Sequence, residues 1–442
     1  MEKFLFGVST AAFQIEGDDG TQGKGESVWD TFCKRENTVY LDQSPVVTTD
    51  HYNRWEEDVE LMKELGVNAY RFSISWARIF PQGVGGINPK GVKFYTKLVD
   101  RLLSYGIQPV VTLYHWDLPE ALSERGGLRN PDFPKWFSEY VTCIANLFKG
   151  KVRRYVTFNE PINCVNSGYK AGVFAPGLKL NLLQGLKCMH HLLLAHQEAA
   201  KILHAVDKDV KVGFVTSTWE EYPLTDTQEN YEVAKKLFFE KPQYLESVDS
   251  YLDPVYLGKY PQRLLDEVPE FAKYVEKDDF SLSPSLTDFV GLNNYGGHAI
   301  DEKGMQMPIT TQTKISNIGV EVDEKGLYYG VKFLTDRYAR PVIITETGCC
   351  CNDWVSTDGN IYDQPRIDCI SLYLSSVEKL LAEGYNVGGY FVWSLMDNFE
   401  WISGYSKRFG LVHIDFDTLK RTKKQSYYWY QQYIRAHTEM KR

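Results

Sequence analysis

Eight short apolar runs alternate with stretches of helical periodicity, and this alternation constrains the fold of the chain more than any other feature. The runs lie at residues 4–10, 68–76, 108–115, 154–159, 210–217, 288–294, 341–345 and 387–393. Ordinary helix signals fill the gaps; Asn88 and Pro89 predict the start of one helix and Gly106 its end. Strand and helix in regular alternation predict a parallel sheet. We therefore expect an α/β protein, a (β/α)8 TIM barrel that forms a single domain over residues 1–442.

An open, doubly wound sheet is the alternative arrangement for the same alternation. Its dinucleotide-binding form requires a Gly-x-Gly-x-x-Gly motif after an early strand, and no such motif follows an early run here. The hydrophobic share of 43% in a chain of 442 residues supports a large core. These observations favour the closed barrel.

Charge and cysteine content exclude several classes of partner. Lys and Arg total 49 against 58 Asp and Glu, a net charge of -9, which argues against binding to nucleic acid or to an anionic membrane. No apolar run approaches the roughly 18 residues of a membrane span, and the first residues lead into a strand instead of a signal peptide. The eight cysteines form no CxxC pairs, and no Asn-x-Ser/Thr sequon occurs. We expect a cytoplasmic protein with reduced thiols.

Polar residues gather where the predicted strands end, the place where TIM barrels carry their chemistry. In chain order these residues are Gln14, Arg71, His115, Trp116, Asn159, Glu160, Asn293, Tyr295, Glu346, Trp393, Glu400 and Trp401. Two of them, Glu160 and Glu346, are carboxylates placed where an apolar run meets a Pro or Gly turn. A structural ion pair with Arg71 could explain one such carboxylate. It does not readily explain two carboxylates on different strands.

Paired carboxylates among amide, imidazole and indole groups suit the cleavage of an acetal. One carboxyl group protonates the leaving oxygen, the other attacks or activates water, and the neutral donors hold sugar hydroxyls. The competing interpretation is a metal-dependent hydrolase barrel, which needs histidines clustered at strand ends. His190, His191 and His196 instead fall on a predicted helix. The residues alone thus favour glycoside hydrolysis without a metal site.

Seven segments carry a resemblance to a known family: FGVSTAAFQIEG at 6–17, YRFSISW at 70–76, LYHWDLP at 113–119, TFNEP at 157–161, ITETG at 344–348, WSLMDNFEW at 393–401 and GYSKRFG at 404–410. With these motifs in this order, the chain resembles the family 1 glycoside hydrolases, the β-glucosidase and β-galactosidase group, along nearly its whole length. The resemblance implies a single-domain barrel that hydrolyses β-glycosides with retention and uses no metal or organic cofactor.

The resemblance also implies a role for each residue of the site. Glu160 would be the general acid/base and Glu346 the nucleophile, about 5 to 5.5 Å apart as in retaining enzymes. Arg71 and Tyr295 would keep the nucleophile ionised. The substrate-binding set would be Gln14, His115, Trp116, Asn159, Asn293, Tyr295, Trp393, Glu400 and Trp401, with Asn159 on the sugar 2-hydroxyl and Trp393 beneath the ring.

The expected substrates are small β-glucosides or short β-linked oligosaccharides, from which the enzyme releases a terminal, non-reducing, unphosphorylated β-D-glucose. Phospho-glycosidase relatives replace the acidic residue at the sugar 4- and 6-positions, whereas this chain keeps Glu400, and Phe409 stands where their phosphate-binding Tyr is expected. A β-galactosidase, β-fucosidase or transglycosidase of the same family remains open. The non-enzyme alternative is a catalytically silent sugar-binding relative.

Three positions, Thr347, Asn294 and Val320, depart from the family pattern; Asn294 replaces the middle residue of an Asn-Tyr-Tyr motif whose outer two residues are kept. Thr347 follows the nucleophile where Asn is usual, so a hydrogen bond near Glu346 is altered. Val320 takes the place of a Trp that lines the entrance for the leaving group, which predicts a wider entrance and weaker selectivity for planar aglycones. The run of residues 349–351, three consecutive cysteines, is expected to be small buried thiols without a metal or redox role.

Overall fold

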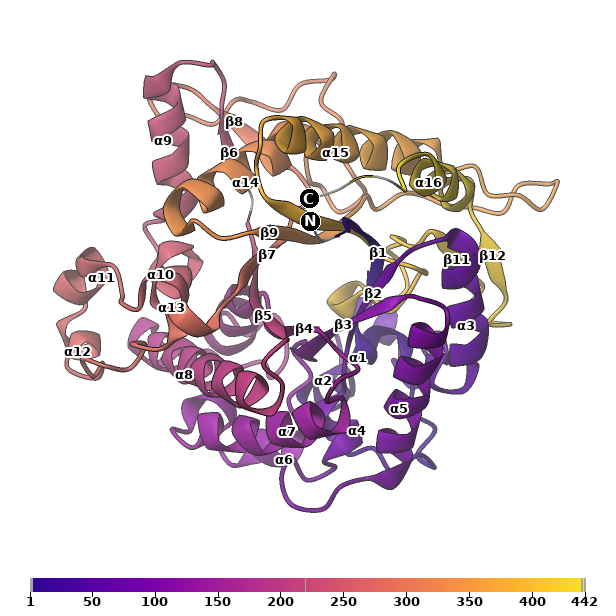
Figure 1. Ribbon diagram of the computed structural model, residues 1–442, viewed down its shortest axis with the longest axis horizontal. Helices are drawn as coiled ribbons and strands as arrows, with labels where there is room; N and C mark the ends of the chain where they lie inside the picture. Colours follow the sequence, from indigo (N-terminus) through magenta and orange to yellow (C-terminus); the bar gives the residue numbers. More distant parts are fainter. Residues whose placement is uncertain (1–2, 219, 439, 441–442) are drawn as a thin grey trace.

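Eight parallel strands close into a barrel in the computed structural model, which describes residues 3–218, 220–438 and 440 (Figure 1). Each predicted run overlaps one of the strands, which are β1 (Leu5–Thr10), β2 (Ala69–Ser73), β3 (Gln108–Tyr114), β4 (Arg154–Asn159), β5 (Lys211–Ser217), β7 (Phe289–Asn293), β9 (Val342–Thr347) and β10 (Val387–Trp393). Neighbouring strands follow chain order, and β10 pairs with β1. The (β/α)8 TIM barrel is confirmed, and the open sheet is excluded.

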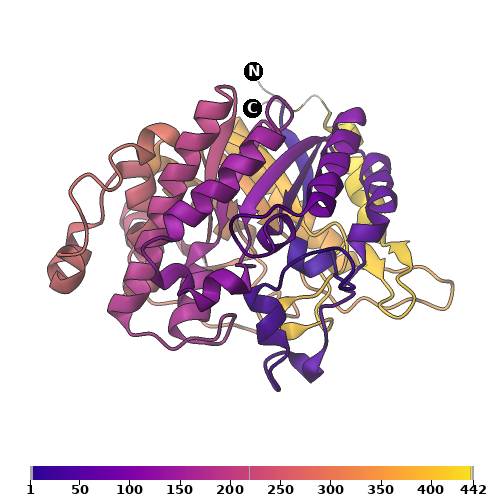
Figure 2. The ribbon, with the colours of Figure 1, turned by 90° about the horizontal axis from the view of Figure 1, so that it is seen from below.

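Helices surround the strands and connect them (Figure 1), and the side view places them outside the barrel (Figure 2). The long helices are α3 (His51–Leu65), α5 (Pro89–Ser104), α7 (Phe133–Leu147), α8 (Leu182–Val206), α14 (Glu324–Tyr338), α15 (Gln364–Ala382) and α16 (Gln425–Ala436). Shorter helices lie in the connections: α1 (Ala12–Ile15), α2 (Val28–Cys33), α4 (Trp76–Ile79), α6 (Glu120–Glu124), α9 (Gln228–Phe239), α10 (Asp249–Leu257), α11 (Gln262–Glu267), α12 (Pro269–Ala272) and α13 (Ser283–Leu286). Single turns are η1 (Tyr40–Asp42), η2 (Gly127–Arg129), η4 (Tyr244–Glu246) and η5 (Trp401–Ser403), and η3 (Asn163–Lys170) is π-helical.

Helix α5 shows how local sequence sets an element. The Asn88 side chain caps it by accepting a hydrogen bond from the Lys90 N–H, and Pro89 occupies its first turn, where a missing N–H costs nothing. The helix ends at Ser104, just before Gly106 adopts a left-handed φ of 73°. Both predicted ends of this helix are therefore confirmed.

One apolar residue from each barrel strand fills the interior below the polar strand ends. These eight residues, which we call the apolar plug, are Leu5, Ala69, Val110, Val156, Val215, Phe289, Ile343 and Phe391. The two large rings fit because glycines face them: a Cβ on Gly213 would lie 2.2 Å from the Phe289 ring, and one on Gly7 would lie 2.3 Å from the Phe391 ring. Side chains thus fill the barrel interior at this layer.

Two small sheets lie outside the barrel and were not predicted from the sequence. Strand β6 (Glu220–Pro223) pairs with β8 (Gly297–Ile300) beyond the ends of β5 and β7, and β11 (Val412–Ile414) pairs with β12 (Arg421–Lys423). In the described part of the chain, none of the helices combines the length and the apolar character needed to cross a membrane.

Candidate active site

The polar strand ends line a pocket of about 410 Å³ on the carboxyl-terminal side of the barrel. Ten of the twelve predicted site residues line it: His115, Trp116, Asn159, Glu160, Asn293, Tyr295, Glu346, Trp393, Glu400 and Trp401. The other two lie behind its wall, where Arg71 contacts Glu346 and Gln14 contacts Glu400. The structure therefore brings all twelve residues together at one site.

Glu346 lies at the end of β9 between a cation and a phenol. The Arg71 guanidinium donates to its Oε1 at 2.6 Å, and the Tyr295 hydroxyl donates to its Oε2 at 2.7 Å. Burial raises the pKa of the Glu346 carboxyl, and the two donors oppose that rise. The pKa of Tyr295 is raised well above its ordinary value by burial and by the Glu346 charge, so the phenol stays a donor. Both contacts favour the ionised form that a nucleophile needs.

Glu160 follows β4 in a different environment. Its Oε1 accepts from the Asn293 amide at 2.6 Å, and its Oε2 accepts from the Asn163 amide at 2.6 Å. Burial and the nearby Glu346 charge raise its pKa to about 7, against the lowering effects of the two amides and Arg71. A carboxyl group with this pKa can hold its proton near neutral pH and still release it, as an acid/base catalyst requires.

Asn159 lies between Arg71 and His115 and is hydrogen-bonded to both. Its Oδ1 accepts from Arg71 at 2.6 Å, and its Nδ2 lies 3.0 Å from His115 Nε2. Burial and the Arg71 charge hold the pKa of His115 well below its ordinary value, so the imidazole is neutral and accepts this bond. The Trp116 indole donates to the Asn159 carbonyl oxygen at 2.8 Å. With Asn293, which also donates to Oδ1 at 3.0 Å, three side chains fix the Asn159 amide in one orientation, and Trp116 holds its main chain.

Glu400 lines the same pocket as Glu160 and Glu346, in the segment after β10. Gln14 donates to its Oε2 at 3.2 Å and to Asn398 Oδ1 at 3.0 Å, while the buried Gln14 Oε1 has no partner among the described residues. Burial and the charges of Glu346 and Glu160 raise the pKa of Glu400 to about 8. This wall can both donate to and accept from the hydroxyls of a sugar.

Aromatic rings complete the pocket. Trp401 lies 4.7 Å from the Trp116 ring and 4.6 Å from the Trp29 ring, and it stacks on Phe13 at an interplanar angle of 2°. Trp393, 4% exposed, packs near Phe409 and Tyr295. Such rigid ring faces at the wall of the pocket suit contact with the apolar face of a pyranose.

Three residues of the pocket have strained backbone angles. Trp116, Glu160 and Trp401 have φ values of 74°, 45° and 49°, a left-handed region that costs a side-chain-bearing residue about 1 kcal/mol or more. Asn159 and Asn293 lie at irregularities in the pairing of β4 with β5 and of β7 with β9. Such bulges redirect side chains next to active sites.

Sequence reasoning missed six lining residues: Asn163, Ser167, Phe174, Ser217, Thr218 and Ile318. They come from the π-helical segment η3, from loops or from the last position of a strand, where a single polar or apolar residue gives no pattern. Only Asn163 had a usable signal, since it lies three residues after Glu160, close enough for one turn to join their side chains.

The expectation that Val320 lines the entrance is wrong. Val320 is 5% exposed and packs against Gly296, whereas Ile318, 37% exposed, lines the pocket from the same loop. The cause is a tight turn in which the Ser316 N–H donates to the Val320 carbonyl oxygen and Gly319 adopts a φ of 82°. The turn directs Val320 inward and leaves Ile318 at the surface.

The cysteine run after β9 is buried, as expected. Cys349, Cys350 and Cys351 are at most 9% exposed, and burial contributes to a raised pKa at each thiol. Thr347, also buried, has a hydroxyl that finds no hydrogen-bond partner among the described residues. Three His, Cys, Asp or Glu side chains placed to hold a metal ion are not found in the described ranges.

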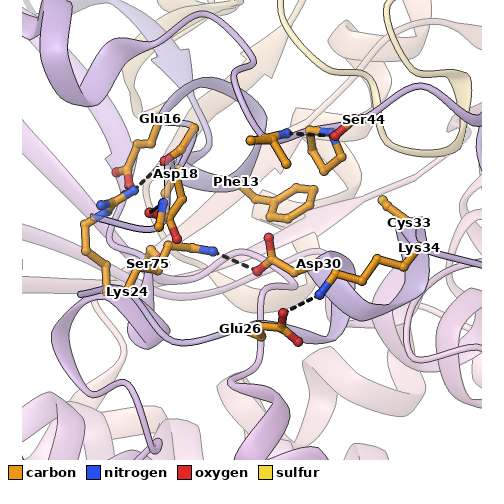
Figure 3. A pocket seen from close by; sticks show the side chains of 16 residues that line it. Phe13, Glu16, Asp18, Lys24, Glu26, Asp30, Cys33, Lys34, Ser44 and Ser75 are labelled. Atoms are coloured by element: carbon orange, nitrogen blue, oxygen red, sulfur yellow. Dashed lines mark hydrogen bonds and ion pairs between the residues drawn. The ribbon is translucent and has the colours of Figure 1, made fainter. Parts of the chain in front are cut away.

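A second pocket, of about 220 Å³, lies beside Phe13 and presents a different chemistry (Figure 3). Its charged side chains pair with one another: Lys24 with Asp30 at 2.7 Å and Lys34 with Glu26. Because these charges are compensated within the wall, the pocket lacks the contrasted carboxyl groups of the first. The pocket around Glu160 and Glu346 is therefore the candidate active site.

Comparison with known proteins agrees with this geometry. Beta-glucosidase A of Thermotoga maritima is 40% identical over 439 residues, which cover 98% of this chain and 97% of that protein. The beta-glucosidase of an Agrobacterium species is 39% identical, covering 97% of this chain and 93% of its own. The solved structure of the Thermotoga maritima beta-glucosidase in complex with glucoimidazole has a TM-score of 0.90 at 39% identity and covers 99% of both chains.

A family model described as glycosyl hydrolase family 1 matches residues 1–439. The match therefore spans all eight barrel strands and both carboxyl groups. The chain belongs to glycosyl hydrolase family 1.

Proposed function

We propose that the chain is a retaining β-glucosidase that releases a terminal, non-reducing β-D-glucose by double displacement. The observation that carries the proposal is the contrast between its two buried carboxyl groups. Glu346 contacts a guanidinium and a phenol, whereas Glu160 contacts two neutral amides and has a pKa raised to about 7. One group is thus suited to attack and the other to proton transfer.

In the first step the ionised Glu346 carboxylate attacks the anomeric carbon while Glu160 donates its proton to the leaving oxygen. An ester joins Glu346 to the sugar, and the negative charge that raised the pKa of Glu160 disappears. Glu160 then ionises more easily and takes a proton from the water that attacks the ester. Two inversions at one carbon give net retention.

Other residues of the site supply the sugar contacts. His115, Asn159 and Glu400 offer hydroxyl-binding groups, Gln14 holds Glu400 from behind, and Trp393 offers a ring face beneath the pyranose. In support, the solved structures similar to this chain include the Thermotoga maritima beta-glucosidase in complex with glucoimidazole and with deoxynojirimycin. The relatives named as beta-glucosidases favour glucosides as the substrates of this chain.

We propose that the glucose is unphosphorylated. A phosphate on the 6-position would meet the Glu400 carboxyl group, whose pKa burial and the nearby charges of Glu346 and Glu160 already raise, instead of the cationic donors that a dianion needs. Lys407 does not line the pocket; its ammonium donates to the Asn317 carbonyl oxygen at 2.5 Å. Phe409 adds no hydrogen-bonding group. The test compares kcat/KM for a plain aryl glucoside and for its 6-phosphate, and higher efficiency on the phosphate would overturn the proposal.

The experiment that tests the two carboxyl roles is Glu160→Ala with a series of aryl glucosides. A good leaving group such as 2,4-dinitrophenolate needs no proton, so its glycosylation step should be spared, while alkyl glucosides should lose about 10²- to 10⁴-fold in kcat/KM. Added azide should accelerate the variant and give the β-glucosyl azide. Equal losses for good and poor leaving groups, with no azide effect, would contradict the assignment.

We also propose that residues 1–442 form one catalytic domain and that the protein is cytoplasmic. All eight cysteines are free, as expected of a chain kept in a reducing compartment. Fluorescence microscopy of the tagged protein in its host tests the location.

A further inference from the structure

We propose that Asn163 is a positioning residue for the acid/base carboxyl group, a second amide that holds Glu160 from the side opposite Asn293 and favours its ionised form. The inference rests on the proposed function, in which Glu160 alternates between acid and base. Asn163 belongs to η3, the π-helical segment after β4, whereas Asn293 ends β7. Two separate elements therefore hold the Glu160 carboxyl group, and we call Asn163 and Asn293 together the clamp.

Three hydrogen bonds of Asn163 define its place in the clamp. Asn163 Nδ2 donates to Glu160 Oε2 at 2.6 Å, and its backbone N–H donates to the Glu160 carbonyl oxygen at 3.0 Å. The same Nδ2 donates to the Ser217 hydroxyl at the end of β5 at 3.1 Å. One turn of chain thus binds Glu160 through main chain and side chain together, and the neighbouring strand orients the amide.

The two amides differ in how firmly they are held. Asn293 is fully buried, and the Thr345 hydroxyl donates to its Oδ1 at 2.7 Å, which fixes its orientation. Asn163 is half-buried and lines the pocket beside Ser217. It is therefore the member of the clamp that borders the space where a leaving group and then a water molecule approach Glu160.

The effect on catalysis follows from which charge state the amide recognises. An N–H donor stabilises a carboxylate more than a carboxylic acid, so Asn163 lowers the pKa of Glu160. The other groups facing Glu160 are Glu346 from β9, Arg71 from β2, Tyr295 after β7 and Glu400 after β10. When Glu346 becomes an ester, its opposing charge is lost while the clamp remains. Asn163 then helps Glu160 to become the base of the second step.

The test is Asn163→Leu, which keeps the size of the side chain and removes its donor. Without the donor the pKa of Glu160 should rise by about 0.5 to 1 unit. The alkaline limb of kcat/KM for an aryl glucoside should move up by that amount. With 2,4-dinitrophenyl glucoside, where breakdown of the ester limits kcat, the acid limb of kcat should move up too. A purely structural role would lower the melting temperature and leave both limbs in place.

Two further variants sharpen the test. Asn163→Ser restores a hydroxyl donor and should return part of the shift, whether or not Asn163→Leu is less stable. Ser167→Ala is the matched control, because Ser167 lies on the same segment and lines the same pocket while making no hydrogen bond to Glu160 in the described structure. Its pH profile should match that of the parent enzyme.

Direct titration separates this proposal from the proposed function. Carbon-13 NMR of glutamate labelled at Cδ, with the Glu160 signal assigned by its loss in Glu160→Gln, reports the pKa without turnover. A higher pKa in Asn163→Leu supports the clamp even if no glucoside were hydrolysed. An unchanged pKa together with unmoved limbs, in an enzyme that does hydrolyse glucosides, overturns it.

Discussion

The two layers of the barrel interior use the same strands for opposite purposes. Ala69 belongs to the apolar plug, and Arg71, two residues later on β2, contacts Glu346; on β10 the same step leads from Phe391 to Trp393. The plug is purely apolar and tightly matched to its glycines. The layer above it buries three carboxyl groups with raised pKa values, Glu160, Glu346 and Glu400.

The apolar plug stabilises the folded chain, whereas the polar layer above it destabilises the folded chain. Burying apolar area stabilises the folded chain by about 25 cal/mol per Å². A carboxyl group whose pKa is raised by folding does the reverse at neutral pH, because ionisation then favours the unfolded chain. The three left-handed residues around the pocket add further strain. The stability contributed by the apolar plug thus offsets the cost of burying carboxyl groups and straining the backbone at the site.

Removing the nucleophile should give the largest effect in the upper layer. Glu346→Ala should lower kcat/KM for aryl glucosides by about 10⁴-fold or more, because no covalent intermediate can form. Steady-state kinetics checks the loss, and circular dichroism checks that the barrel is folded. Residual activity above a few per cent, after removal of contaminating parent enzyme, would contradict the role of Glu346.

A change in the plug should act on stability instead of chemistry. Phe289→Ala should cost about 3 to 5 kcal/mol of unfolding free energy, because it leaves a cavity over Gly213. Below the new melting temperature, kcat/KM should stay within about twofold of the parent value. Phe289→Leu, the matched control, should cost less because it retains most of the apolar volume. A large loss of activity in folded Phe289→Ala would show that the two layers are coupled.

Neutralising the acid/base should stabilise the enzyme in a pH-dependent way. The pKa of Glu160 is about 7 in the folded chain against an ordinary value of 4.5, so its ionisation penalises folding progressively as pH rises from about 4.5 to 7. Glu160→Gln lacks that penalty. It should be more stable than the parent by about 1 to 3 kcal/mol at pH 8 and no more stable at pH 4. Thermal unfolding at the two pH values measures the difference, and a gain that is equal at both would rule out this cause.

Sequence patterns predicted the lower layer and the strand ends well, for a physical reason. A buried strand must be apolar, so every barrel strand could be recognised, and a parallel barrel brings all carboxyl-terminal strand ends to one face. This rule places Gln14 and Glu400, which are far apart in the chain, at the same face, and in the structure they are joined by a hydrogen bond.

Loop geometry could not be predicted by the same reasoning. Asn163 contacts Glu160 only because a π-helical turn follows the strand, and Ile318 replaces Val320 at the entrance only because of one tight turn. The two small sheets outside the barrel also depend on loop paths. Each of these features depends on a few backbone angles and not on a repeated pattern of residues. A single sequence therefore gives no periodic signal from which to predict them.

The smallest predicted effect concerns the entrance to the pocket, where the shape of a single side chain should change the binding of the leaving group. Ile318 lines the pocket, so Ile318→Trp should place a flat ring against the leaving group. Stacking is worth about 0.5 to 1.5 kcal/mol, so KM for aryl glucosides or cellobiose should fall about twofold to tenfold, with little change for methyl glucoside. Val320→Trp is the contrasting variant. Because Val320 is buried against Gly296, the larger ring should cost about 1 to 3 kcal/mol of stability and leave KM unchanged. Should Val320→Trp lower KM while Ile318→Trp does not, the turn at 316–320 would have to direct the opposite residue toward the leaving group.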